Sequence, residues 1–204
     1  MSEINEKVIL TDADGVLLDW QYGFNSWMSS RGYEIVVPDV YPIDVRYDIP
    51  KAFGKDLVRH FNESANVGHM TPFRDAIKYV KKLHEEHGYV FHVITSQTNN
   101  WMAQKLRIKN LQEIFGKSVF DEYTILGTGD DKGDILSEYI DTDCYWIEDK
   151  FENFEQGVQF GLKGILMGHN YNLKDYGSSP YGYDHPRVNN WKQIYEYVTG
   201  TVSC

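Results

Sequence analysis

The chain has 204 residues, and its 20 lysines and arginines against 30 aspartates and glutamates leave a formal net charge of −10. Hydrophobic residues make up 42% of the sequence and aromatic residues 15%, which is more core material than a disordered chain carries. The acidic balance argues against binding to nucleic-acid polymers and to anionic membranes, because both select lysine and arginine.

No apolar run approaches the ~20 residues of a membrane-spanning helix, and the polar segment 1–7 does not resemble a signal peptide. The two cysteines, Cys144 and Cys204, lack the spacing of a metal site, and we expect no disulfide framework. These features predict a cytoplasmic protein of one domain. A homodimer is left open, because the sequence does not determine the oligomeric state.

Short apolar runs alternate with helical patterns along the chain. Five runs of four to six residues lack the polar alternation of a half-exposed strand, which is typical of strands covered on both faces. They are residues 8–11, 89–94, 123–126, 144–147 and 164–167. Strands that alternate with helices predict an α/β fold with a parallel sheet and right-handed crossovers.

Helices are expected between these strands. One pattern predicts a helix that has Thr71 as its N-cap, Pro72 at its first helical position and Gly88 at its end. The other expected helices cover residues 101–115, 134–140 and 151–160 and the C-terminal segment from Trp191. The segment 168–186 is rich in glycine, tyrosine and asparagine and predicts a long loop.

One interval departs from this alternation. Residues 19–70 contain no convincing core strand, and helical patterns at 20–30 and 50–61 flank a segment rich in proline and aspartate. An insertion directly after the first strand predicts a small cap over the strand ends. The predicted division is therefore a core of residues 1–18 and 71–204 and a cap of residues 19–70.

Polar side chains follow four of the predicted strands. In open α/β sheets, ligands bind beyond the carboxyl ends of the strands, so these side chains are expected to meet at one edge. They are Asp12 and Asp14 after the first strand, Thr95 and Ser96 after the second, Lys132 after the third, and Glu148 and Asp149 after the fourth. Carboxylates, hydroxyls and one ammonium group suit a divalent cation together with a phosphoryl group.

The chemistry of these groups points to phosphoryl transfer. Hard cations such as Mg²⁺ prefer oxygen ligands, and Asp12 with Asp149 would supply two carboxylates. Asp12 could then attack phosphorus and form an aspartyl-phosphate. Asp14 is placed to protonate the leaving oxygen and afterwards to deprotonate water.

Three further residues would bind the phosphoryl oxygens. We expect Thr95, Ser96 and Lys132 to hold the equatorial oxygens, whose charge must be stabilised during transfer. Gly15 would let the backbone turn sharply beneath the metal.

Each of these features has a structural alternative. Asp14-Gly15 also fits a type I′ hairpin, whereas a calcium-binding loop is excluded because Leu17 and Gly23 occupy its required glycine and glutamate positions. The Thr95 hydroxyl could cap a strand end, and Lys132 could be a solvated lysine. The four features together, in this order and at strand ends, are much less frequent by chance than any one of them.

Together these residues resemble the motifs of the haloacid dehalogenase superfamily of aspartate-dependent phosphohydrolases. The run Asp12-Ala13-Asp14-Gly15-Val16 resembles its first motif, Thr95 its second, Lys132 its third, and Glu148-Asp149 with Asn153 its fourth. The resemblance implies a three-layer, Rossmann-like parallel-sheet core with a small helical cap inserted after the first strand. It also implies Mg²⁺ held by the Asp12 carboxylate, the Asp14 backbone carbonyl and Asp149.

Within that superfamily the chain is most similar to the small 5′(3′)-deoxyribonucleotidases. The similarity rests on residues 12–20, the compact cap, the Thr95-Ser96 pair and the late Arg187-Val188 and Trp191 segment. It implies that Trp20 stacks on a nucleobase, while the alternative for Trp20 is an anchor between cap and core. Gln97 stands where that group usually has proline, and we expect it to contact the substrate there.

The sequence therefore predicts a Mg²⁺-dependent phosphomonoesterase that acts on a small phosphorylated substrate, with a nucleoside monophosphate as the favoured one. A phosphatase or mutase for a sugar phosphate or another small metabolite is the nearest alternative, because it would use the same catalytic residues. An aspartate-phosphorylated receiver domain and a non-catalytic binding protein are alternatives of a different class.

Overall fold

The computed structural model describes residues 7–180 and 184–201. The segment 1–6, which bears on the signal-peptide prediction, lies outside these residues, and so does Cys204. Cys144 is buried with a free thiol. Within the described residues, no helix combines the length and the apolar composition that crossing a bilayer requires.

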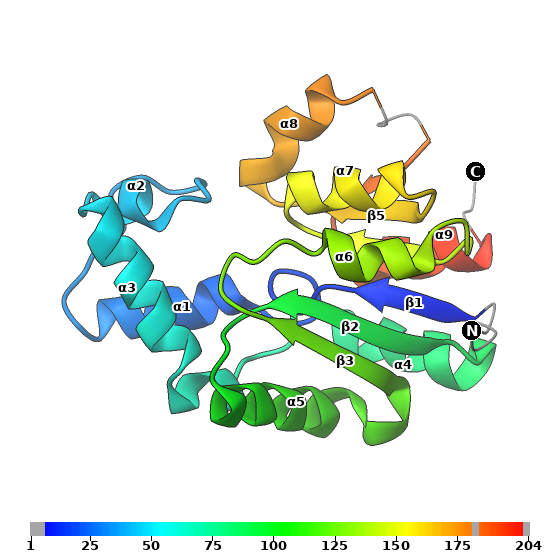
Figure 1. The fold of residues 1–204 in the computed structure, drawn as a ribbon, viewed down its shortest axis with the longest axis horizontal. Helices are drawn as coiled ribbons and strands as arrows, with labels where there is room; N and C mark the ends of the chain where they lie inside the picture. The colour runs from blue at the N-terminus through cyan, green and yellow to red at the C-terminus, as the bar shows by residue number, and fades with distance from the viewer. Residues whose placement is uncertain (1–6, 181–183, 202–204) are drawn as a thin grey trace.

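The core is a parallel sheet of six strands, which confirms the predicted fold class. The strands are β1 (Val8–Thr11), β2 (Val90–Ser96), β3 (Phe120–Leu126), β4 (Tyr145–Glu148), β5 (Lys163–Met167) and β6 (Arg187–Val188). Their order in the sheet is β3-β2-β1-β4-β5-β6, so the first strand lies in the middle (Figure 1). Two residues carry no periodicity, which explains why β6, directly after the predicted loop 168–186, was not predicted as a strand.

Helices cover both faces of this sheet. Alternation along β1 sends Ile9 to one hydrophobic cluster and Val8 and Leu10 to the other. Helices α4 (Ala76–His87), α5 (Trp101–Phe115) and α9 (Trp191–Thr199) contribute to the first cluster, and α6 (Gly133–Leu136) contributes to the second. Helix α7 (Phe151–Gln159) packs against β4 and β5. The result is the predicted three-layer arrangement.

Two helix boundaries differ from the predictions. Helix α4 begins at Ala76 with Asp75 at its N-cap, so the prediction of Thr71 as N-cap was wrong. The Thr71–Phe73 segment instead pairs with the chain after β1, where the Phe73 amide donates to the Leu17 carbonyl at 2.8 Å. The helix expected over 134–140 is also shorter, because α6 ends at Leu136 and continues only as a 3₁₀ turn.

The insertion after β1 forms a helical cap, which lies beside the core in Figure 1. It contains α1 (Trp20–Ser29), α2 (Ile43–Tyr47), α3 (Lys51–Asn62) and a 3₁₀ turn at Ala65–Gly68. Phe24 and Phe61 are fully buried and meet edge to face, with ring centroids 5.3 Å apart. The aromatic residues of the cap thus build a core of their own.

The segment predicted as one long loop after β5 is partly helical. A 3₁₀ turn at Asn170–Asn172 leads into α8 (Leu173–Ser178). None of the residues of α8 is buried, so this helix has no apolar face for a sequence pattern to reveal.

Candidate active site

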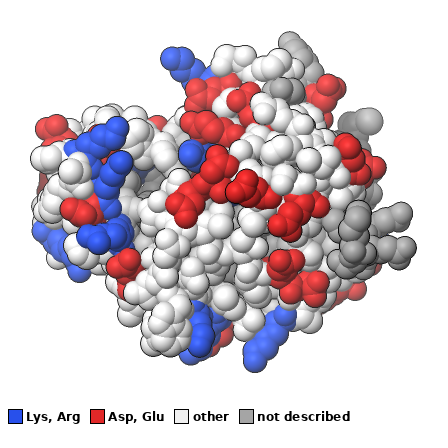
Figure 2. Space-filling model, viewed as in Figure 1, with Lys and Arg blue, Asp and Glu red and all other residues white. Residues whose placement is uncertain are grey.

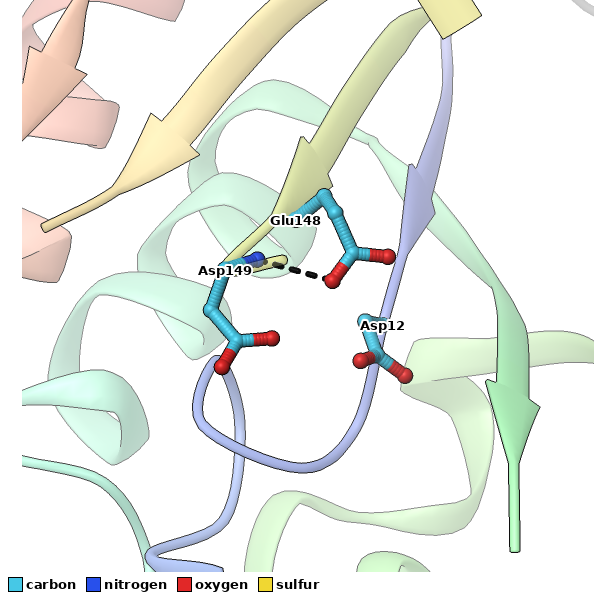
Figure 3. Close-up of side chains that lie close together, drawn as sticks. All are labelled: Asp12, Glu148 and Asp149. Carbon is cyan, nitrogen blue, oxygen red and sulfur yellow. Dashed lines mark hydrogen bonds between the residues drawn. The ribbon is translucent and has the colours of Figure 1, made fainter. Parts of the chain in front are cut away.

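Three carboxylates gather where β1 and β4 end. Asp12 follows β1, Glu148 is the last residue of β4, and Asp149 comes directly after it (Figure 3). The strands are neighbours in register, with Thr11 opposite Ile147, so their ends meet at one edge of the sheet. One oxygen from each of the three carboxyl groups lies within 4.8 Å of the others, and all three residues are buried. We call these three residues the acidic cluster.

The chain after β1 turns tightly beneath this cluster. The Gly15 amide donates to the Leu18 carbonyl at 2.8 Å, and Leu17 and Leu18 both donate to the Ala13 carbonyl. Gly15 has φ +77, and a Cβ atom there would collide with the Asp149 carboxylate. The hairpin alternative was wrong, because β1 pairs in parallel with β2 and β4 rather than folding back on itself.

Lys132 lies at the N-terminus of α6 and reaches into the acidic cluster. Its Nζ atom lies 2.7 Å from Glu148 Oε2 and 3.1 Å from Asp12 Oδ1. Burial acts to lower the pKa of Lys132, but the two neighbouring carboxylates outweigh it and raise that pKa above its usual value. The lysine is therefore a fixed positive charge, and the alternative of a solvated lysine was wrong.

Glu148 is occupied by protein donors. Its Oε1 atom accepts the backbone N–H groups of Asp149 and Lys150, both at 2.9 Å. Its Oε2 atom accepts from Lys132 and, at 3.3 Å, from Asn153. This carboxylate therefore orients Lys132, which leaves Asp12 and Asp149 as the carboxylates that could ligate a metal.

Burial dominates the titration of the cluster. It raises the pKa of Asp12 to about 6, against the opposing effects of Lys132 and a hydrogen bond from Thr95. Burial, followed by the charge of Asp12, also raises the pKa of Asp149 to about 6. Three carboxylates and one ammonium sum to a formal charge of −3 + 1 = −2. A divalent cation would neutralise that charge with the oxygen donors it prefers.

Asp14 is held by an arginine that the sequence did not single out. Arg107 comes from α5, is fully buried, and places its two terminal nitrogens 2.5 Å and 3.3 Å from the two Asp14 oxygens. Burial raises the pKa of Asp14 to about 6, and the Arg107 charge opposes this. On an amphipathic helix, the sequence around a buried arginine does not differ in pattern from the sequence around a solvated one.

The residues at the end of β2 and directly after it divide into two groups. Thr95 is buried and hydrogen-bonds the Asp12 carboxylate, which brings it into the site. Ser96 donates its hydroxyl to the Asp130 carbonyl at 3.0 Å. Gln97 is fully buried and donates to the Asn62 carbonyl at 2.9 Å, while Asn62 donates back to the Gln97 carbonyl at 3.1 Å. In this structure Gln97 therefore joins the cap to the core.

Trp20 is engaged inside the cap. Its ring stacks on Phe24 with centroids 4.7 Å apart and meets the edge of Phe61 at 5.6 Å. Its indole N–H donates to Asn62 Oδ1 at 2.9 Å. These contacts lie within the cap and favour the packing alternative for Trp20, which is linked to the core through the Asn62–Gln97 hydrogen bonds.

The loop after β5 contributes two aromatic residues to the site. The Tyr171 hydroxyl donates to Asp149 Oδ2, and His169 Nε2 lies 2.8 Å from the Gly15 carbonyl. The two rings stack on each other with centroids 4.8 Å apart. Burial lowers the pKa of His169 to about 4, so the ring is neutral and donates from Nε2. Both residues follow a predicted strand. The expectation that ligands bind beyond the carboxyl ends of the strands could therefore have identified them.

No family model matches the sequence. Among solved structures, a haloacid dehalogenase-like hydrolase from Streptococcus pneumoniae is similar with a TM-score of 0.64 and 16% identity, over 94% of this chain and 98% of that one. The chain has the haloacid dehalogenase-like fold. D,D-heptose 1,7-bisphosphate phosphatase from B. bronchiseptica, complexed with magnesium and phosphate, shares this fold with a TM-score of 0.59 and 12% identity, over 96% and 99% of the two chains.

One relative in sequence matches part of the chain. An uncharacterized 32.4 kDa protein of the Gp30-rIII intergenic region of Enterobacteria phage T4 is 26% identical over 119 residues. The match covers 54% of this chain and 41% of that protein, so the chain spans less than half the length of this relative.

Proposed function

We propose that the protein is a Mg²⁺-dependent phosphomonoesterase that works through an aspartyl-phosphate on Asp12. The observation that carries the proposal is the pairing of buried Asp12 with Lys132 in a cluster whose residual charge is −2. The heptose bisphosphate phosphatase with this fold, which holds magnesium and phosphate, supports it. Asp12, Asp149 and the Asp14 carbonyl would hold the ion, which lets an anionic carboxylate approach an anionic phosphate.

The proposed reaction has two steps. In the first, an Asp12 carboxylate oxygen forms a bond to phosphorus, the ester P–O bond breaks, and the leaving oxygen takes a proton from Asp14. In the second, water gives its proton to Asp14 and bonds to phosphorus, and the bond from phosphorus to Asp12 breaks to release phosphate. Lys132 and the Thr95 hydroxyl would stabilise the charge on the phosphoryl oxygens.

The favoured substrate is a nucleoside monophosphate, with a sugar phosphate as the alternative. Tyr41 and Tyr171 meet at the site edge to face, with ring centroids 5.3 Å apart, and Tyr41 is 55% exposed. The exposed ring of Tyr41 lies beside Tyr171, which contacts Asp149. Such a ring is a suitable surface for stacking a nucleobase. Trp20→Ala should separate the two roles of Trp20: a larger rise in KM for nucleotides than for a small phosphate ester supports stacking, and equal effects support packing.

Released phosphate from p-nitrophenyl phosphate, nucleoside monophosphates and sugar phosphates tests the proposal. We expect activity with Mg²⁺, loss of activity with a chelator, and recovery on adding Mg²⁺ back. Asp12→Asn should abolish turnover because an amide is a poor nucleophile. The matched control is Asp56→Asn, which removes an exposed carboxylate of α3. Activity that persists with chelator, or in Asp12→Asn, would refute the proposal.

A further inference from the structure

A cavity of about 410 Å³ lies between the cap and the core, next to the acidic cluster. Gln21 and Asp39 line it from the cap, and Arg74, the Gly168–Tyr171 segment and Arg187 line it from the core. The volume is in the range of small-molecule binding sites. His169 and Tyr171 belong both to this cavity and to the site, because they contact Gly15 and Asp149. We call this cavity the arginine pocket.

Two guanidinium groups line the arginine pocket and donate to consecutive carbonyls of the loop after β5. Arg187 is anchored by Asn172 Oδ1 at 3.0 Å and by the His169 carbonyl at 2.7 Å. Arg74 donates to the Gly168 carbonyl at 3.2 Å and lies over the Phe73 ring. Backbone carbonyls and an amide orient both side chains without neutralising them.

Among the residues that the structure describes, neither arginine has a carboxylate in direct contact, although Asp19 and Asp75 act on Arg74 from a longer distance and Asp39 lines the pocket. Within residues 7–180 and 184–201, no carboxylate forms an ion pair with either guanidinium, whereas Arg107 and Arg59 each have one. Burial lowers the pKa of Arg187, and the charge of Arg74 lowers it further. Such a pair of like charges is unfavourable until an anion lies between them. Figure 2 shows that acidic side chains are frequent on the visible face of the core.

The backbone at Arg74 is also unusual. Its φ of +43 lies in the left-handed region, which costs a residue with a side chain of this size. The fold holds this conformation directly before α4, and it aims the guanidinium at the loop after β5. Strain of this kind is concentrated at ligand-binding sites.

We propose that the arginine pocket binds a second phosphate group of the substrate. This refines the substrate proposed above: a nucleoside or sugar phosphate that carries two phosphate groups is preferred over the same compound with one. The inference rests on the proposed function for the site of hydrolysis. One phosphate lies at Asp12, the carbon frame passes Tyr171, and the other phosphate lies between Arg74 and Arg187. The planar guanidinium group of arginine presents paired N–H donors that fit two phosphate oxygens, and its charge is opposite to that of the phosphate.

Binding to a protein that cannot turn over tests the inference apart from hydrolysis. In an Asp12→Asn background with Mg²⁺, calorimetry compares a nucleoside 3′,5′-bisphosphate with its 5′-monophosphate, and fructose 1,6-bisphosphate with fructose 6-phosphate. We expect at least one bisphosphate to bind roughly 10-fold or more tightly than its monophosphate. One hydrogen bond to a charged group contributes enough binding free energy for a factor of that size.

Variants of the pocket should move that preference in opposite directions. Arg74→Met and Arg187→Gln should lower the preference by roughly 10-fold each. Asp39→Asn should raise it, because it removes a lining carboxylate and asparagine tolerates the left-handed φ of +62 at this position. Arg59→Met on the exposed face of α3 is the control with the same charge change and should leave the preference unaltered.

The outcomes separate the two proposals. Bisphosphates that bind no more tightly than monophosphates, or pocket variants that weaken both ligands equally, overturn the second phosphate site. If the preference and its variant effects appear but the wild type hydrolyses none of the substrates, the pocket stands and the proposed phosphomonoesterase function fails. If Arg187→Gln does not fold, Arg74→Met and Asp39→Asn decide the matter, because both residues are exposed.

Discussion

Lys132 supplies the positive charge that partly compensates the carboxylates of the acidic cluster. It is 1% exposed and contacts two carboxylates that are themselves buried. A buried ion pair contributes little by comparison with apolar residues, but removing one partner leaves an uncompensated charge. The lysine is therefore needed both for the fold of this edge and for the proposed stabilisation of phosphoryl oxygens.

We predict that Lys132→Met lowers the free energy of unfolding by about 3–5 kcal/mol and abolishes hydrolysis. Chemical denaturation measures the first effect and phosphate release the second. Lys109→Met is the control, because Lys109 pairs with Glu113 on the surface of α5 and should cost under about 1 kcal/mol. A stability loss of the same size in both variants would contradict this account of Lys132.

Asp14 is the residue on which proton transfer should depend. We predict that Asp14→Asn slows the hydrolysis of alkyl phosphates by roughly 10²–10⁴-fold. p-Nitrophenyl phosphate should be slowed less, because its leaving group departs without a proton. Steady-state kinetics on both esters gives the comparison, and an equal loss on both would show that Asp14 acts through structure rather than as an acid.

At the scale of elements, the turn after β1 and the loop after β5 hold the site from two sides. Gly15 passes directly beneath the Asp149 carboxylate, while His169 and Tyr171 contact Gly15 and Asp149 from the other side. These contacts join the ends of β1, β4 and β5. A small shift in either segment would move a proposed metal ligand.

We predict that Gly15→Ala weakens Mg²⁺ binding by roughly 10-fold or more, because the new methyl group would displace Asp149. Isothermal calorimetry measures the affinity. Gly32→Ala is a matched control: Gly32 has a φ of +82 but no atom within 4 Å of an added Cβ, so this variant bears the backbone strain alone. Equal Mg²⁺ affinity in the two variants would argue against Asp149 as a ligand.

At the scale of the whole molecule, buried acidic groups link metal binding to pH. In the metal-free protein the pKa values of Asp12 and Asp149 are raised to about 6. Below that pH, protons occupy the carboxylates that the proposed metal needs, and above it the carboxylates are charged and repel each other. Metal binding should therefore strengthen as pH rises through about 6 and change little at higher pH.

We predict that Mg²⁺ raises the melting temperature clearly at about pH 7.5 and by much less at about pH 5. Differential scanning fluorimetry with and without Mg²⁺ at each pH gives the two shifts. Comparing the shifts cancels other titrating groups such as His169, which affect both samples alike. A shift of the same size at both pH values would refute the link between these carboxylates and the metal.

The sequence by itself determined five of the six strands and the placement of Asp12, Thr95, Lys132 and Asp149 at the edge of the sheet. Buried parallel strands leave continuous apolar runs, and the residues after such runs share one edge whatever the order of the strands. Only the tertiary structure decided the partners across that edge. Arg107 opposite Asp14, Tyr171 on Asp149, and Arg74 near Arg187 come from segments distant in the chain, and no local period encodes which side chains will meet. The same reason holds for Trp20, whose role depends on what Phe24, Phe61 and Asn62 place around it.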